Sequence, residues 1–472
     1  MNAYLLSIVI YALILIAVGF IVTRRVKGAS DFFVAGRKLG PALLFTTLIA
    51  PNIGGGSTVG VAGLGYKFGV SAWWWIGASA LGSFILAVVV GPAIWRIAKK
   101  YNLYTLGDYL DFRYNRNFRG LISLLLAVGS LAIFAGQLMG IAWILGVVAG
   151  TDKSTGILLA ALVVVLYFGA GGLLSAAFVN IIQIIVKFFG FLLAVPFVLS
   201  YVGGWEGLNS MIAQNMAAQS NVDSYFSYTG MGLTMIIGYF LMLTPSFFIS
   251  PGLIGKVYGA KDEHTVRLGT ALNAFVQLLF AMVPVVLGMC AFAIFPDLTD
   301  RELALPTVLK EILPFWVSAL ALAAIFSAEV SAADAILYMV TTSFTKDLYK
   351  TFVNPNISDK SLLKISRVVT FVAGAAGVVI ALILPNIITA LSIFYSLMSV
   401  SLTAPLLFGL FSRRPSTAAA FICAISGIAV TILLQFGNAG KGLWILNAQS
   451  TGVIVTLVIM TFMMYVFPAK VK

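Results

Sequence analysis

Long apolar runs separated by short polar connections make up almost the whole chain. A helix needs about 20 apolar residues to cross the roughly 30 Å of hydrocarbon in a bilayer. The pattern therefore predicts an all-α integral membrane protein with about 13 transmembrane helices. The runs cover residues 3–23, 43–66, 72–98, 117–149, 154–168, 173–202, 231–250, 267–296, 306–345, 364–383, 386–411, 416–436 and 451–467.

The composition excludes a water-soluble protein. Of the 472 residues, 61% are hydrophobic and 10% are charged, and the charged share is less than half of what soluble proteins carry. The two cysteines, Cys290 and Cys423, lie in apolar runs, and the one histidine, His264, lies in a polar connection. We therefore expect neither a disulfide framework nor a Cys/His metal centre.

The formal net charge of +13 does not indicate a nucleic-acid partner, because the cations alternate with the apolar runs. Of the 29 Lys and Arg residues, 23 lie in one set of alternate connections and 5 in the other, while Lys187 lies inside a run. The positive-inside rule then predicts an inner or plasma membrane protein with its N-terminus outside and its C-terminus cytoplasmic. The first run is followed rather than preceded by cations, unlike a cleavable signal peptide, so we expect it to stay in the protein.

Two of the runs are interrupted by helix-breaking residues. The first interruption, at 50–57, contains Pro51 and three consecutive glycines, and the second, at 244–252, contains Pro245 and Pro251. Unpaired backbone groups in hydrocarbon cost several kcal/mol each, so such breaks are expected to line an enclosed cavity or to bind an ion. The alternative is that these residues only permit close helix packing.

The positions of the two breaks favour the first interpretation, because each break opens a block of five helices. Two five-helix halves that each start with a discontinuous helix are typical of a secondary transporter with an inverted repeat. The predicted division is an extra helix and inner loop at 1–42, repeats at 43–202 and 231–436, an outer loop at 203–230 and a C-terminal helix at 437–472.

Several short strings of residues are spread along nearly the whole chain. They are Asp31-Phe32-Phe33-Val34-Ala35-Gly36-Arg37, Ala50-Pro51-Asn52-Ile53-Gly54, Gly65-Tyr66-Lys67-Phe68-Gly69, Thr105-Leu106-Gly107-Asp108-Tyr109-Leu110, Gly171-Gly172-Leu173 with Phe178-Val179-Asn180-Ile181-Ile182-Gln183, and Thr345-Lys346-Asp347-Leu348-Tyr349-Lys350. Together they resemble the sodium:solute symporter family. The resemblance implies the five-plus-five inverted repeat of the leucine-transporter type, with broken helices 2 and 7.

The same resemblance implies a sodium site between helices 2 and 9. Its ligands are the carbonyl groups of Ala50, Ile53 and Ala328 and the hydroxyl groups of Ser331 and of the residue after it. That residue is Ala332, so one hydroxyl is missing, whereas sodium prefers about five oxygen ligands. We expect Asp334, nearly one turn beyond Ser331, to add charge to this site or to a neighbouring one.

The sixth predicted helix, at 173–202, departs from the family pattern in its charges. The family carries an aspartate near the sodium site, and the matching residue is Asn180. Asn180, Gln183 and Lys187 follow an i, i+3, i+7 spacing and so share one helix face. Lys187 and, on helix 9, Glu329 both fall near the middle of the membrane, where a charge must be paired or face water.

Three interpretations of Lys187 and Glu329 remain open. The first is a structural ion pair between helices 6 and 9. In the second, the Lys187 ammonium stands where the cation would otherwise bind and its protonation couples transport to protons, since burial disfavours the charged form of a lysine and lets it lose its proton more easily. In the third, one of the two residues contacts a charged substrate.

The predicted function is secondary active transport of a small organic solute by cation-coupled symport, with sodium as the expected coupling ion, no other cofactor and membrane lipid as the surroundings. No nucleic-acid or obligate protein partner is expected. The alternatives are a proton-coupled or uncoupled carrier and, more remotely, a membrane sensor or an intramembrane enzyme, which the lack of a catalytic cluster disfavours. The solute is expected at the two breaks, against Asn52, Gly54, Gly56, Ser57, Thr244 and Ser246.

Two further groups of residues have simple interpretations. Trp73, Trp74 and Trp75 follow an outer connection and are expected to anchor the membrane interface. Glu302 and Glu311 lie at the start of an outer helical segment and are expected to be solvated caps.

Overall fold

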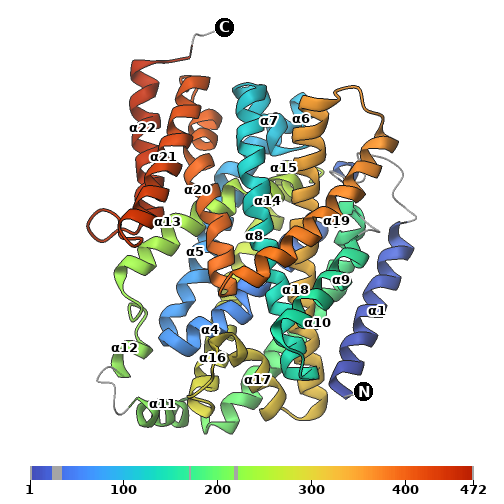
Figure 1. Ribbon diagram of the computed structural model, residues 1–472, viewed down its shortest axis with the longest axis vertical. Coiled ribbons are helices and arrows are strands. Elements are labelled where there is room, and N and C mark those ends of the chain that lie inside the picture. Colours follow the sequence, from blue (N-terminus) through green and yellow to red (C-terminus); the bar gives the residue numbers. More distant parts are fainter. Residues whose placement is uncertain (1–2, 24–34, 169–171, 217–221, 470–472) are drawn as a thin grey trace.

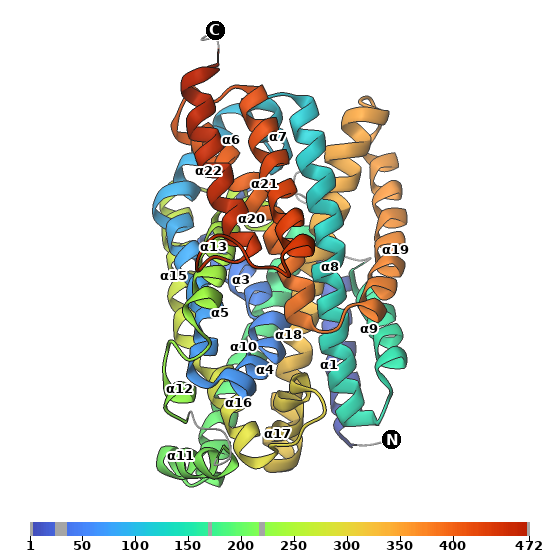
Figure 2. The same cartoon turned by 60° about the vertical axis from the view of Figure 1, so that its left-hand side comes forward.

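The computed structural model describes residues 3–23, 35–168, 172–216 and 222–469. Within these residues the named elements are all helices, most of which run between two ends of an upright bundle (Figure 1). The N-terminus lies at one end and the C-terminus at the other in both views (Figure 2). Termini at opposite ends agree with an odd number of crossings.

Eight of the longer elements are uninterrupted helices. They are α1 (Ala3–Thr23), α8 (Arg116–Ala149), α9 (Lys153–Phe168), α10 (Gly172–Tyr201), α19 (Asp359–Ile383), α20 (Ile387–Phe411), α21 (Thr417–Gly437) and α22 (Ala448–Val466).

The other longer elements consist of consecutive segments. They are α3 (Pro41–Asn52), η2 (Gly55–Ser57) and α4 (Val59–Phe68); η3 (Gly69–Ala72), α5 (Trp73–Ile85), η4 (Leu86–Val90) and α6 (Gly91–Tyr101); α13 (Leu233–Ile249) and α14 (Pro251–Tyr258); α15 (Glu263–Phe280) and α16 (Met282–Ile294); and α18 (Phe315–Thr342) and η6 (Ser343–Val353).

Short helices occupy the connections at the two ends. We call the end that carries the C-terminus the basic end. The helices α6 and α7 (Leu106–Arg113) lie there. The short helix η1 (Ala35–Arg37) lies in the connection before α3. At the opposite end lie α11 (Gly204–Asn215), α12 (Val222–Phe226) and α17 (Ala304–Ile312), which follows η5 (Arg301–Leu303) (Figure 1). The predicted outer loop at 203–230 thus contains helical segments.

Most helix boundaries lie near the ends of the apolar runs, but α14 falls between two runs and one predicted helix is divided. The predicted single helix over 306–345 is wrong, because α17 and α18 are separate helices. Pro314 lies between them with an extended backbone (φ −54°, ψ 146°), and proline cannot continue the preceding helix. Within the described residues, ten helices are long and apolar enough to span a membrane, and two shorter apolar helices accompany them. The count of about 13 crossings and the repeat boundaries stay predictions.

The first predicted break is formed by an extended backbone between α3 and η2. Ile53 (φ −90°, ψ 72°) and Gly54 (φ −114°, ψ −167°) leave the helical conformation. The Ser57 hydroxyl lies 2.7 Å from the Asn52 carbonyl oxygen, and the Gly55 N–H donates to Gln137 Oε1 at 2.9 Å. Side chains therefore satisfy backbone groups that the helix has left free.

The second break lies later than part of the prediction placed it. The α13 helix continues through Thr244, Pro245 and Ser246 and ends at Ile249. Ser250 is extended (φ −53°, ψ 125°), and Pro251 begins α14. A proline at the first position of a helix loses no hydrogen bond, so Pro251 starts the new helix while Pro245 is tolerated within the old one.

The core of the bundle is the place where α3, α10 and α18 pack against one another, with α8 against α18. The α18 helix is buried along most of its length and lies inside the bundle in both views. These elements bring the first break next to the charged residues of α10 and α18. Parts of the strings at 31–37 and 171–173 lie outside the described residues.

Candidate ion and solute site

The ammonium group of Lys187 occupies a pocket of oxygen atoms at the first break. Its Nζ donates to the Ala50 carbonyl at 2.6 Å, to the Ile53 carbonyl at 3.1 Å and to the Ser331 hydroxyl at 2.6 Å. Lys187 is fully buried. An ammonium group has three donors, so its hydrogen-bonding capacity is used completely by α3 and its break on one side and by α18 on the other.

The residues that the resemblance marks for sodium therefore meet, but around a side-chain cation. Ser331 Oγ lies 3.0 Å from the carbonyl oxygens of both Ala50 and Ala328. Ala332, which replaces the missing hydroxyl, lines the neighbouring cavity. The role of these residues in ion binding stays a prediction.

Glu329, two residues before Ser331, is a fully buried carboxylate near the Thr58 hydroxyl, which donates to the Gly54 carbonyl at 2.9 Å instead. Neither of its oxygens has a hydrogen-bond partner among the described residues. The carboxylate lies against Gly55 and Gly140, where the Cβ of any larger residue would overlap it. No ion pair within 4.0 Å joins it to Lys187 in the described chain. The two residues are therefore not in direct contact, as the first of the three open interpretations would have it, but their charges remain close enough to attract.

The two amides predicted to share the Lys187 face are both buried. Gln183 is fully buried, and neither atom of its side-chain amide has a partner in the described part of the chain. Its backbone carbonyl accepts a long hydrogen bond of 3.4 Å from Ser327, whose hydroxyl also accepts from Tyr11 at 2.9 Å. Asn180 is 6% exposed. These amides form a polar strip on α10, but no hydrogen bond links their side chains to Lys187.

Beside the Lys187 pocket lies a cavity of about 100 Å³ between the two breaks. Five of the six residues predicted to contact solute line it: Asn52, Gly54, Gly56, Ser57 and Ser246. Thr244 is not among the lining residues, because its hydroxyl is directed at α5 and donates to the Ala78 carbonyl at 2.8 Å. The remaining lining residues that matter for its chemistry are Trp75, Ser79, Gln137, Phe247, Lys256, Phe394 and Tyr395.

Trp75 corrects the expectation of a simple interfacial anchor. It is 4% exposed and forms part of the cavity wall, with its ring edge-on to those of Tyr239 and Tyr395. Trp74 does fit an interfacial role, since it is half-buried and its indole donates to the Tyr228 carbonyl. The run of three tryptophans on one helix thus turns one ring inward, as helical periodicity requires.

Lys256 is a cavity residue that sequence reasoning missed. It lies in α14, is 6% exposed and supplies the charged group among the lining residues. Asp334, on α18, attracts it electrostatically, but no salt bridge within 4.0 Å joins the two in the described part of the chain. Asp334 is therefore associated with Lys256 and has no contact with the Lys187 pocket in the described chain. The available signal was the placement of Lys256 among apolar residues about one turn after the Ser250-Pro251 break.

Glu302 is not the solvated cap that its position predicted. It is 1% exposed, its Oε1 accepts from the Ile387 N–H at 2.6 Å, and its Oε2 accepts from Trp143 Nε1 at 2.7 Å. Burial raises the pKa of Glu302 to about 7, and these two hydrogen bonds oppose the shift only partly. Glu311, in contrast, is exposed next to Lys310.

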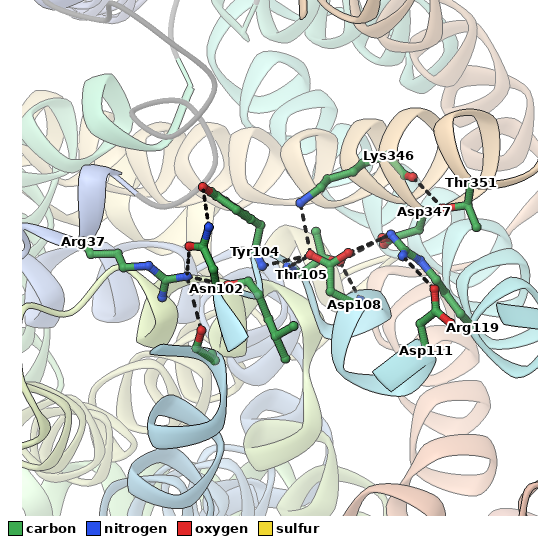
Figure 3. A network of polar contacts seen from close by, with 12 residues as sticks. Arg37, Asn102, Tyr104, Thr105, Asp108, Asp111, Arg119, Lys346, Asp347 and Thr351 are labelled. Carbon is green, nitrogen blue, oxygen red and sulfur yellow. Dashed lines mark hydrogen bonds and ion pairs between the residues drawn. The ribbon is translucent and has the colours of Figure 1, made fainter. Parts of the chain in front are cut away.

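A second cluster of buried charges lies at the basic end, between α7, α8 and η6 (Figure 3). Arg119 contacts Asp347 at 2.7 Å, Asp108 at 2.9 Å and Asp111 at 3.4 Å, and Lys346 contacts Asp108 at 3.1 Å. Burial alone would raise the pKa of Asp108, but Lys346 and Arg119 lower it below its usual value. Two of the strings that carry the resemblance, 105–110 and 345–350, thus meet in one network.

Known proteins resemble this chain over most of its length. A model described as the sodium:solute symporter family matches residues 32–427. The sodium/glucose cotransporter of Vibrio parahaemolyticus is 25% identical over 90% of this chain and 84% of its own length. The sodium/pantothenate symporter of Escherichia coli (strain K12) is 27% identical over 92% of this chain and 91% of its own length.

A solved structure has the same fold. It is a Na⁺-coupled sialic acid symporter in a substrate-bound, outward-open state, with a TM-score of 0.81, 20% identity and coverage of 99% of this chain and 98% of that one. The predicted fold, an inverted repeat of the leucine-transporter type, is thereby confirmed. So is the predicted class, a multi-pass membrane protein that carries a small solute by cation-coupled symport and alternating access. The family and these neighbours are transporters rather than enzymes.

Proposed function

Because the chain belongs to the sodium:solute symporter family, we propose that it carries a small organic solute through the cavity between its two broken helices together with a proton. The Lys187 ammonium is the bound cation in this scheme. One observation carries the proposal: Lys187 Nζ lies within hydrogen-bond distance of three oxygens that the family resemblance assigns to sodium.

Sodium and the Lys187 ammonium compete for the same oxygens. Both are compact cations that need several oxygen atoms at short range. With Nζ 2.6 Å from the Ala50 carbonyl oxygen and from the Ser331 hydroxyl, no room is left for a second cation among them. A proton carried on Lys187 therefore supplies the positive charge that sodium would otherwise bring.

The position of Lys187 explains how its charge is coupled to conformation. The charged side chain holds the carbonyls at the break of α3 and the hydroxyl of α18 to the same atom. When the amine is neutral, it donates two hydrogens instead of three and the electrostatic attraction to the carbonyl dipoles is lost. Protonation thus favours the arrangement with these helices joined, and deprotonation favours their separation, as a two-state transporter requires.

The cavity beside this pocket is where the solute would bind. Backbone at the breaks, the Gln137 amide and serine hydroxyls offer hydrogen bonds, while Trp75, Phe394 and Tyr395 offer apolar and aromatic surface. Such a wall suits a small solute with both polar and apolar parts. The solute-binding roles of Asn52, Gly54, Gly56, Ser57 and Ser246 belong to this proposal.

Sodium coupling is the second candidate, and the relatives favour it because they are named as sodium symporters or cotransporters. In this scheme Lys187 must leave the Ala50 and Ile53 carbonyls before sodium binds. The four remaining oxygens, from Ala50, Ile53, Ala328 and Ser331, would need water or another ligand to complete the site.

Transport by the purified protein in liposomes separates the two candidates. A panel of sugars, amino acids, carboxylates and quaternary amines is added outside, and a trapped pH indicator reports proton entry with and without sodium. We expect an imposed pH gradient to drive accumulation of the active solute in sodium-free buffer, and Lys187→Met to abolish it. Accumulation that follows the sodium gradient and ignores pH would refute proton coupling.

The orientation in the membrane belongs to the same proposal, with the basic end cytoplasmic and the C-terminus on that side. A reporter fused to the C-terminus should be active in the cytoplasm, and a tag inserted in the 203–230 segment should be accessible outside intact cells. Accessibility of a tag placed between Lys346 and Lys364 would contradict this topology.

A further inference from the structure

We infer that Glu302 and Glu329 are successive proton-binding groups on a path from the α11–α17 end of the bundle to Lys187. This inference rests on the proposed proton coupling and extends it to the route of the proton. The starting observation is that two buried carboxylates, Glu302 and Glu329, lie close enough to repel each other, and that Glu329 also lies close enough to Lys187 to attract it.

The α8 helix fixes the spacing between the two carboxylates. Glu329 lies against Gly140, and Glu302 accepts a hydrogen bond from Trp143. These α8 residues are three positions apart, which is a rise of about 4.5 Å and nearly one turn on the same face. Glu302 and Glu329 therefore lie beside consecutive turns of one helix.

The surroundings of Glu329 suit a group that holds a proton temporarily. Its oxygens have no hydrogen-bond partner among the described residues, since the nearby Thr58 hydroxyl donates to the Gly54 carbonyl instead. The absence of side chains at Gly55 and Gly140 is what leaves space for the carboxylate. The charged groups that face it are Lys187, from α10, and Glu302, from η5. A buried carboxylate without donors favours protonation or a bound cation, and the adjacent Lys187 ammonium already has its three acceptors.

Glu302 provides the entrance. It follows Asp300, which is half-buried, and the exposed residues at 296–297 belong to the same connection at the α11–α17 end. Its carboxylate is held by the Ile387 N–H and by Trp143, so it stays in place in either protonation state. With a pKa of about 7, it exchanges protons with water near neutral pH.

The transfer needs no reactant other than the proton. The O–H bond of protonated Glu302 breaks as an O–H bond forms on the Glu329 carboxylate, and Glu302 is then reprotonated from water at its own end. The Glu329 O–H bond next breaks as the lone pair of neutral Lys187 Nζ forms an N–H bond. Lys187 is left as the ammonium and Glu329 as the carboxylate, so the charge created on one is balanced by the other.

Glutamine variants test the path, since glutamine keeps the size of glutamate but cannot carry the proton. The matched control is Glu311→Gln, an exposed position on α17 near the same end of the bundle. Two quantities are measured in liposomes: accumulation driven by a pH gradient, and solute exchange at equal pH on both sides. We expect Glu329→Gln and Glu302→Gln to lose accumulation at least about tenfold while exchange persists, and Glu311→Gln to behave as the wild type.

A second measurement covers the case in which Glu329→Gln does not fold. Glu329→Asp retains a titratable carboxylate and should keep pH-driven accumulation at a reduced rate. In addition, the Trp143 indole donates to Glu302 and so reports its charge. The fluorescence of Trp143, obtained as the difference between the wild type and Trp143→Phe, should change with pH around 7. This change should be absent in Glu302→Gln.

The outcomes separate the path from the proposed function. If wild-type accumulation depends on the pH gradient and on Lys187, but Glu302→Gln and Glu329→Gln retain it within twofold, the path is refuted and proton coupling stands. Loss of a sodium requirement in Glu329→Gln would make Glu329 a sodium ligand and would also refute the path. A wild type driven by sodium alone would refute the proposed function itself.

Discussion

Two clusters of buried charges among the described residues differ in how completely they are paired. In the basic-end cluster, Arg119 and Lys346 contact three aspartates at 2.7 to 3.4 Å (Figure 3). In the central cluster, Lys187 is bound by neutral oxygens while the Glu329 carboxylate has no donor. The first arrangement is that of a structural ion-pair network. In the second, the buried charges are compensated only if the two groups gain and lose protons.

The difference has a physical basis. A buried ion pair with all its hydrogen bonds in place is tolerated, but removing one partner leaves a charge that costs several kcal/mol. The basic-end cluster gains nothing from titration, because Asp108 already has two cations beside it. The central carboxylate gains from taking up a proton, and the central amine gains from its oxygens only when it is charged.

The strongest test of this comparison is the removal of Lys187. Lys187→Met should eliminate pH-driven accumulation, since it removes the titratable amine that donates to the Ala50 and Ile53 carbonyls. Glu329 also loses its nearby positive charge, and we expect a loss of about 3–5 kcal/mol in unfolding free energy. Thermal unfolding in detergent measures the second effect.

The double variant Lys187→Met/Glu329→Gln completes this test. It should recover part of the lost stability, because the unpaired carboxylate is gone, yet it should only exchange solute and not concentrate it. Recovery of accumulation along with stability would mean that the two residues act structurally.

At the basic end, removing a buried cation should lower the unfolding free energy. Arg119→Met leaves Asp347 buried and without its 2.7 Å partner, so unfolding free energy should fall by about 3–5 kcal/mol. The matched control is Arg267→Met, which breaks an exposed i,i+4 pair with Glu263 and should cost less than about 1 kcal/mol. Equal losses in the two variants, measured by thermal unfolding, would contradict a structural role for the cluster.

The sequence predicted the helix breaks and the shared helix face of the central cluster better than the contacts between its helices. Breaks at Pro51 and Pro251, and the shared face of Asn180, Gln183 and Lys187, follow from backbone chemistry and helical periodicity, which act locally. The number of oxygens around Lys187 was not predictable, because it depends on the packing of α18 against α3.

The errors arose where burial is decided by distant segments. Glu302 looked like a cap because its neighbours in the chain are polar, but the Ile387 N–H and the Trp143 indole enclose it. Lys256 looked like one more cation of an inner connection, and its place in the cavity wall depends on the bend at Ser250. Tertiary contacts of this kind leave no periodic signal in the sequence.

A smaller effect is expected from the pH dependence of Glu302. Its pKa rises from 4.5 in the unfolded chain to about 7 in the fold, so its contribution to stability is fully present below pH 4.5 and is lost as the pH rises through 7. The shift corresponds to about 3 kcal/mol as an order of magnitude. Unfolding measured from pH 5 to pH 8.5 should show this decline in the wild type and less of it in Glu302→Gln. An identical decline in both proteins would assign it to other groups.

The smallest expected effect is the conversion of the central cluster into a sodium site. Lys187→Met frees the carbonyls of Ala50 and Ile53 and the Ser331 hydroxyl, and adding Ala332→Ser would supply the hydroxyl that the family pattern has. Sodium at tenfold its dissociation constant should then raise the stability of the double variant by about 1.4 kcal/mol, seen as a higher unfolding temperature in sodium than in potassium. The wild type, whose own ammonium fills the pocket, should not respond. A sodium response of the same size in the wild type would mean that sodium displaces Lys187, and the central cluster would then differ from the basic-end cluster in the cation it exchanges rather than in its protonation.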